Sequence, residues 1–168
     1  PGCTNCYAMK QAHRFSAPGQ PYAGLTRLRT KGGPGWTGTA REVPEMLGEP
    51  LRWRKPSRVF VNSMSDLFHE RLLERSIARV FASMAFAPEI DFLCLTKRAD
   101  RAESILGTGR FHDQIIDEMN AMRYVSERIA GIRWPLPNVW LGVSCEDQKR
   151  ADERIPHLLR TPAAVRFL

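Results

Sequence analysis

Two cysteines near the start of the chain have the spacing of a metal-binding or redox pair. Two residues separate Cys3 from Cys6, so both thiolates can reach one metal centre. Such pairs occur in half of a zinc site, in thioredoxin-like redox centres and among iron–sulfur ligands. The chain has no second Cys-x-x-Cys and no His-rich partner, which argues against structural zinc, and no strand is evident before the pair to favour a redox centre. An iron–sulfur cluster would need further cysteine from upstream.

Polar residues directly follow three apolar segments and form the second group that could do chemistry. They are Asn62, Ser63, Ser65 and Asp66 after the first segment, Thr96, Lys97 and Arg98 after the second, and Ser144, Cys145, Glu146 and Asp147 after the third. If the segments are parallel strands, their carboxyl ends meet at one edge of the sheet, where α/β folds bind ligands. Each acid could instead cap the helix that follows it. Three polar strand ends in succession nevertheless predict a site at this edge.

The elements that position these residues read as repeating strand–helix units. Nearly continuous apolar runs at 58–61, 92–95, 139–143 and 164–168 are typical of parallel strands buried on both faces. Helical spacing of apolar residues between the runs predicts helices over 72–87, 114–129 and 148–159. Right-handed crossovers of this kind build an open doubly wound sheet or a (β/α) barrel.

The domain organisation follows from the same pattern. The chain is expected to be a single α/β domain, with the cysteine motif and a first helix in 1–15, a loop-rich basic insertion in 16–57 and the strand–helix units in 58–168. A short strand or hairpin is expected near 36–41. Because a closed barrel needs more strands than these and the chain ends within a strand, we expect a partial (β/α) barrel, truncated at both ends.

The charge distribution points to an anionic partner. The net charge is +7, and residues 1–60 hold ten Lys or Arg against three Asp or Glu, whereas 61–168 hold fifteen of each. We expect nucleic-acid binding through segment 1–60, where Trp53 lies among basic residues; the alternative is that these basic loops are simply solvated. The lack of a long apolar run indicates no membrane association, and four unevenly spaced cysteines indicate a reducing cytoplasm.

Several blocks of the sequence together resemble a known family. The blocks are residues 1–8, 51–56, 58–69, 95–98, 134–144 and 146–148. They are similar to a phage and bacterial family of uncharacterised proteins with a three-cysteine motif, which looks like a divergent branch of the radical S-adenosylmethionine enzymes. The resemblance spans nearly the whole chain.

The resemblance implies an iron–sulfur enzyme. Cys3 and Cys6 would be two ligands of a 4Fe–4S cluster whose third cysteine lies upstream of this chain, and the open iron would take S-adenosylmethionine. Tyr7 matches the aromatic residue that lies by the adenine in such enzymes. By position, the cofactor or substrate would be held by the residues at the strand ends: Asn62, Ser63, Ser65, Asp66, Thr96, Lys97, Arg98, Ser144 and Glu146. Without its third cysteine, this chain is expected to assemble no cluster or an unstable one.

Two other functions remain open from the residues alone. One is a module that binds nucleic acid or a partner, in which the cysteines hold zinc or no metal. The other is a phosphate-handling hydrolase that holds a divalent ion with Asp66, Glu146 and Asp147.

Overall fold

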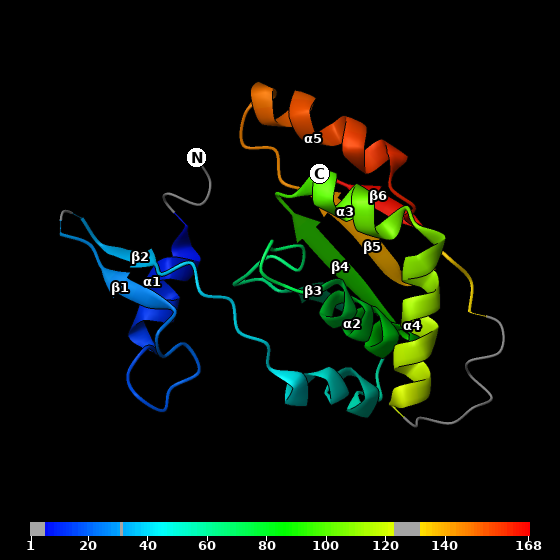
Figure 1. Cartoon of the computed structure of the whole chain (residues 1–168), viewed down its shortest axis with the longest axis horizontal. Helices are drawn as coiled ribbons and strands as arrows, with labels where there is room; N and C mark the ends of the chain where they lie inside the picture. The colour runs from blue at the N-terminus through cyan, green and yellow to red at the C-terminus, as the bar shows by residue number, and fades with distance from the viewer. Residues whose placement is uncertain (1–5, 31, 123–131) are drawn as a thin grey trace. The chain divides into compact units, whose positions relative to one another are not determined.

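The chain folds into two compact units, each described here by itself. The structure is a computed structural model that describes residues 6–30, 32–122 and 132–168 (Figure 1). The N-terminal unit comprises Pro1–Arg41 with Ser63–Ser65, and the sheet unit comprises Glu42–Asn62 with Asp66–Leu168. None of the described helices is long and apolar enough to cross a lipid bilayer.

The sheet unit is built on four parallel strands. They are β3 (Ser57–Val61), β4 (Ile90–Thr96), β5 (Val139–Val143) and β6 (Val165–Phe167), and they lie side by side in that order. The predicted α/β class and the parallel pairing of the four apolar segments are therefore confirmed. The spatial order follows the chain order, so the described strands lack the order reversal that marks a doubly wound sheet.

Helices connect these strands. They are α2 (Glu74–Phe86) between β3 and β4, α3 (Ala99–Leu106) and α4 (Gly109–Ala121) between β4 and β5, and α5 (Gln148–Arg160) between β5 and β6 (Figure 1). Helices were expected over 72–87 and 148–159, and α2 and α5 lie there. The second connection differs, because it contains two helices and α4 begins before residue 114. The predicted extension of this helix to residue 129 lies largely outside the described residues.

The helices cover one face of the sheet. Phe92, Cys94, Leu141 and Val143 point into a buried core that also contains apolar residues of α2, α3, α4 and α5. Aromatic rings fill its centre: the Phe81 and Phe111 centroids lie 5.4 Å apart, and Trp134 lies 6.0 Å from Phe81 and 5.9 Å from Phe111. Cys94 behaves as a small apolar residue, and burial raises the pKa of its thiol to about 12.

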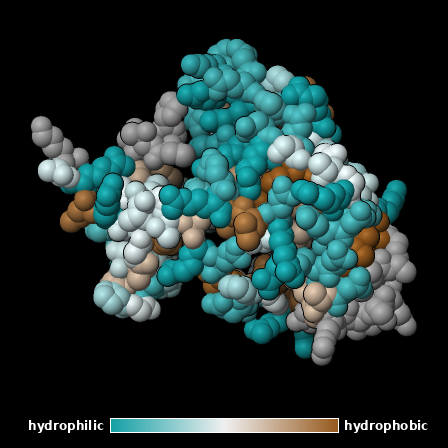
Figure 2. Space-filling model, in the orientation of Figure 1, coloured by the Kyte–Doolittle hydropathy of each residue, from teal (hydrophilic) through white to brown (hydrophobic). Residues whose placement is uncertain are grey.

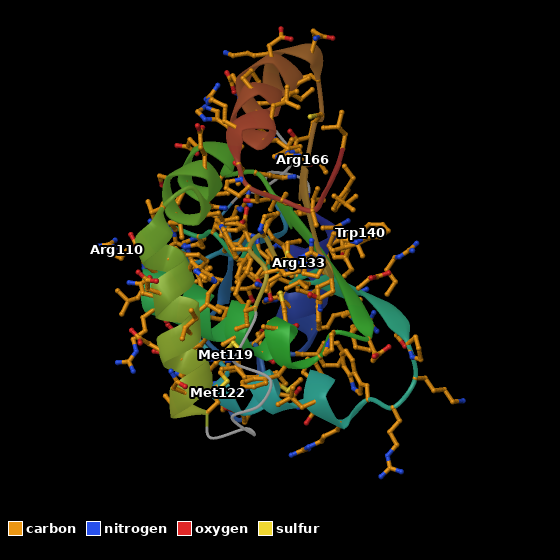
Figure 3. The ribbon with its side chains drawn as sticks, turned by 90° about the vertical axis from the view of Figure 1, so that its right-hand side faces the viewer. Arg110, Met119, Met122, Arg133, Trp140 and Arg166 are labelled. Atoms are coloured by element: carbon orange, nitrogen blue, oxygen red, sulfur yellow. The ribbon has the colours of Figure 1, made fainter. Side chains whose placement is uncertain are left out.

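The opposite face of the sheet is apolar but only partly covered. Phe60, Leu93 and Trp140 are aligned across three strands, and the Phe60 side chain is 46% exposed. Figure 3 shows Trp140 on one side of the sheet and α4 on the other. The Arg58 guanidinium lies 4.5 Å from the centre of the Trp140 ring. Thus β4 alternates buried and half-buried residues, and the expected burial on both faces is not seen, because all four helices pack on the same side.

The N-terminal unit consists of one helix packed against a hairpin. Helix α1 (Tyr7–Arg14) contacts β1 (Thr26–Leu28) and β2 (Pro34–Trp36), which pair antiparallel. The helix buries small and apolar residues, and His13 Nδ1 lies 3.1 Å from Thr26 Oγ1. A short strand or hairpin was expected near 36–41, but the hairpin spans 26–36. Between this hairpin and β3, the sheet unit begins with 3-10 helices at Pro44–Gly48 and Pro50–Arg52.

A buried amide joins three segments of the sheet unit. Asn138 precedes β5, is only 7% exposed and donates from Nδ2 toward the carbonyl oxygens of Met84, Ala87 and Ile90 at 3.0–3.1 Å. These carbonyls lie at the end of α2 and the start of β4. Because a buried carbonyl without a donor is costly, the amide stabilises the turn from α2 into the sheet.

We expect Asn138→Ala to lower the free energy of unfolding by about 2 kcal/mol, since it leaves buried carbonyls without a donor. Asn138→Asp should cost more, because a carboxylate would face the same oxygens. Urea denaturation followed by circular dichroism measures both changes. Asn120→Ala on the exposed surface of α4 is the control and should change stability little; an equal loss in both alanine variants would contradict this role.

Candidate functional site

A hydrogen-bonded carboxylate lies at the carboxyl edge of the sheet. Asp66 Oδ1 accepts from the Phe68 amide at 3.0 Å and from the Thr96 hydroxyl at 2.8 Å. Its Oδ2 accepts from the Lys97 amide at 3.1 Å and from Arg98 Nη1 at 3.0 Å. The side chain is 14% exposed. Asp66 therefore fixes the segment after β3 against the end of β4.

Arg98 extends this cluster to a second carboxylate. Its Nε donates to Glu70 Oε1 at 2.6 Å, and this hydrogen bond is the main reason that the pKa of Glu70 falls to about 2. Burial alone would lower the pKa of Arg98, but the hydrogen bond to Glu70 and the charges of Asp66 and Glu70 raise it. Arg98 is thus a permanent cation between two carboxylates.

Lys97 links the ends of β4 and β5. Its Nζ donates to Ser144 Oγ at 2.8 Å and lies 2.7 Å from Glu146 Oε1. On the other side of Glu146, Arg154 Nη1 donates to Oε2 at 2.9 Å. Burial raises the pKa of Glu146, but the hydrogen bond from Lys97 and the charges of Lys97 and Arg154 outweigh it and lower that pKa to about 2.

We call this group the carboxyl-edge network. It consists of Asp66, Glu70, Thr96, Lys97, Arg98, Ser144, Glu146 and Arg154. Six of these eight residues were expected at the sheet edge from the sequence. The network is the structural basis for a candidate site at that edge.

Four other residues that were expected to hold the cofactor or the substrate lie outside the network. Asn62 is exposed at the end of β3 and has a left-handed backbone (φ 58°), a conformation that asparagine tolerates better than most residues. Ser63 and Ser65 are exposed and belong to the N-terminal unit, as does Tyr7. Tyr7 contacts the loop that leaves β3, because its hydroxyl donates to the Ser63 carbonyl oxygen at 3.0 Å.

Two members of the network were not expected from the sequence. Glu70 lies at one end of the network and Arg154 at the other. Arg154 is one of many charged residues on α5, the helix whose surface is largely hydrophilic in Figure 2. No spacing in the sequence distinguishes either residue from its charged neighbours. Asp147 acts as a helix cap, since its side chain accepts from the Arg150 amide at 2.8 Å.

The cysteine motif is described only in part. Cys3 lies outside the described residues, whereas Cys6 is a free, partly exposed cysteine at the N-cap of α1. Its thiol makes no capping hydrogen bond. Within the described ranges, no three His, Cys, Asp or Glu residues are grouped closely enough to hold a metal ion.

The network is better suited to bind an anion than a divalent cation. Its carboxylates are matched by the cations Lys97, Arg98 and Arg154. An ammonium group has three N–H donors, and Lys97 uses two of them on Ser144 and Glu146. The cations therefore retain donors for a carboxylate or phosphate, while the carboxylates are already paired.

We expect Glu146 to stabilise the fold in a pH-dependent way. Its pKa is about 2 when folded against an ordinary value of 4.5, so its contribution is complete above pH 4.5 and is lost as the pH falls toward 2. Glu146→Gln should lower stability by about 1–2 kcal/mol at neutral pH, and the gap from wild type should close on acidification. Urea denaturation across this range measures the gap. Exposed Glu89→Gln is the control, and a gap that does not change with pH would contradict the assignment.

Comparison with curated proteins and with solved structures finds no match to the chain. A family described as "Protein of unknown function (DUF5131)" matches residues 1–168. This match agrees with the expectation of an uncharacterised family. The chain therefore belongs to the DUF5131 family.

Proposed function

We propose that this protein is an iron–sulfur enzyme of the radical S-adenosylmethionine type, built on an arc of a (β/α) barrel and acting on nucleic acid or a nucleotide. Cys3 and Cys6 would supply cluster ligands, and the carboxyl edge of the sheet would bind the cofactor or the substrate. The contact between Tyr7 and Ser63 carries the proposal. Both residues belong to the N-terminal unit, and the contact joins the residue directly after the cysteine motif to the residues that follow β3 in the chain.

The arrangement of the sheet supports the barrel. In a (β/α) barrel, consecutive parallel strands lie side by side and all helices cover the outer face. The four strands of the sheet unit have this order, and their helices share one face. The other face carries Phe60, Leu93 and Trp140, which suit the apolar interior of a barrel.

The chemistry of the cysteines supports an iron–sulfur cluster. Iron–sulfur clusters are held by the thiolates of cysteine residues. Cys6 directly precedes α1 and is partly exposed. Cys3 would be a second ligand, and the family resemblance expects a third from upstream. A bound cluster would supply the electron that cleaves S-adenosylmethionine.

The cations of the carboxyl-edge network would bind the anionic part of a ligand. Lys97 is held in place by Ser144 and Glu146, and Arg98 by Asp66 and Glu70, so both groups are preorganised. A carboxylate, as in S-adenosylmethionine, or a phosphate, as in a nucleotide, would use their remaining N–H donors. Asn62 in the sheet unit, and Ser63 and Ser65 in the N-terminal unit, are exposed and would bind polar groups of the cofactor or the substrate.

A module that binds nucleic acid or a partner without radical chemistry is the second candidate. It is favoured by the charge of segment 1–60, which holds ten Lys or Arg against three Asp or Glu. In this case the cysteines would hold zinc or no metal. The hydrolase gains no support, because Asp66 and Glu146 are paired with cations and Asp147 caps α5.

Metal analysis tests the proposal. We expect the protein, extended to include its upstream cysteine and reconstituted without oxygen, to bind about four irons and four sulfides per chain. Cys6→Ala should lose most of the iron, whereas Cys145→Ala should retain it, since Cys145 lies outside the motif. Colorimetric iron and sulfide analysis and the visible spectrum measure this. Zinc in place of iron, or no metal in the wild type, would favour the second candidate.

A further inference from the structure

Almost all of the net positive charge of the protein lies in the N-terminal unit. This unit has six Lys or Arg residues and no Asp or Glu, whereas the sheet unit has nineteen Lys or Arg against eighteen Asp or Glu. A folded unit without any carboxylate cannot neutralise its cations internally. Their charge is available to an anionic partner.

The described cations of this unit have no ionic partner. Lys10, Arg14, Arg27, Arg29 and Arg41 are all exposed, and none forms an ion pair in the described part of the chain. Arg41 donates to the Pro21 carbonyl oxygen, and Arg29 lies 3.5 Å from the Met9 sulfur. In the sheet unit, by contrast, Arg98, Arg154 and Arg160 each contact a carboxylate.

The cations lie on regular elements that hold them in fixed positions. Lys10 and Arg14 lie on the exposed side of α1, four residues apart and therefore one turn from each other. Arg27 and Arg29 lie on or directly after β1, two residues apart and so on the same face of the hairpin. The Arg29 side chain extends across Gly35, whose missing Cβ would lie 2.4 Å from Arg29 Nε.

An exposed aromatic ring accompanies the cations. Phe15 follows Arg14 at the end of α1 and is 48% exposed. An exposed ring beside cations can stack on a base while the cations contact phosphates. The apolar side of α1 is already buried through Ala8, Met9 and Ala12, so the helix has no free apolar face to insert into a lipid surface.

We propose that the N-terminal unit is a docking surface for single-stranded nucleic acid, RNA or DNA, with Lys10, Arg14, Arg27 and Arg29 contacting phosphates and Phe15 stacking on a base. This inference deepens the proposed function, because it says which surface binds the nucleic acid and that the nucleic acid is single-stranded. It rests on the proposed function only where it treats the nucleic acid as the substrate. Binding itself needs no cluster and is measured on iron-free protein.

Fluorescence anisotropy with short labelled single strands of RNA and DNA tests the docking surface on the full chain. Arg14→Glu combined with Arg27→Glu should weaken binding at least about tenfold at low salt. The slope of log affinity against log salt should become shallower by about 0.7 for each phosphate that the variant no longer binds. Phe15→Ala should weaken strand binding roughly tenfold but leave binding of polyphosphate, which has no bases, unchanged.

Matched controls separate this surface from others. Arg133→Glu combined with Lys149→Glu changes the charge equally, at exposed residues of the sheet unit outside segment 1–60, and should leave binding nearly unchanged. Circular dichroism and thermal melting must show that all variants fold. Binding of either strand with these effects supports the proposal. No binding at low salt, an equal loss in the control pair, or tighter binding of anionic lipid vesicles than of the strands overturns it, whatever the iron analysis finds.

Discussion

The carboxylate of Asp66 is the interaction on which the candidate site depends. Parallel strands bring their carboxyl ends to one edge, but the segments that leave them are irregular and need side chains to fix them. Asp66 fixes the segments that leave β3 and β4 by accepting four hydrogen bonds. Lys97 fixes the segments that leave β4 and β5 through its contacts with Ser144 and Glu146. The same contacts that hold the edge together preorganise two cations at it.

The two units divide the chemistry between them. The sheet unit is nearly neutral, and its charges at the carboxyl edge are arranged in pairs around Lys97 and Arg98. The N-terminal unit carries the cysteine motif and an excess of cations, and those among its described residues form no ion pair. A cluster held by thiolates and a surface that attracts a polyanion would thus both lie in the unit that contains α1. The sheet unit would contribute a preorganised anion site.

Much of the fold was predictable because the local pattern and the tertiary structure agree. The apolar segments at 58–61, 92–95 and 139–143 are strands, and the helical spacing after residue 72 predicted α2. Helix α3 was missed because its buried Ala99, Ala102 and Ile105 are small or widely spaced among charged residues. The hairpin was placed too late, since β1 and β2 are three residues each and the glycines around them give little periodicity.

The sequence by itself determined that polar residues follow three of the parallel strands, that two cysteines have the spacing of a metal-binding or redox pair, and that the net positive charge lies near the N-terminus. Only the tertiary structure decided which strand-end residues meet. Glu70 and Arg154 belong to the network, and Asp147 caps a helix. The reason is that the path of each loop and helix sets the distances between these side chains and their partners. It also decided that the helices share one face of the sheet. Hydrophobic pattern specifies which side chains are buried, but the partners of a polar side chain depend on segments that lie far away in the chain.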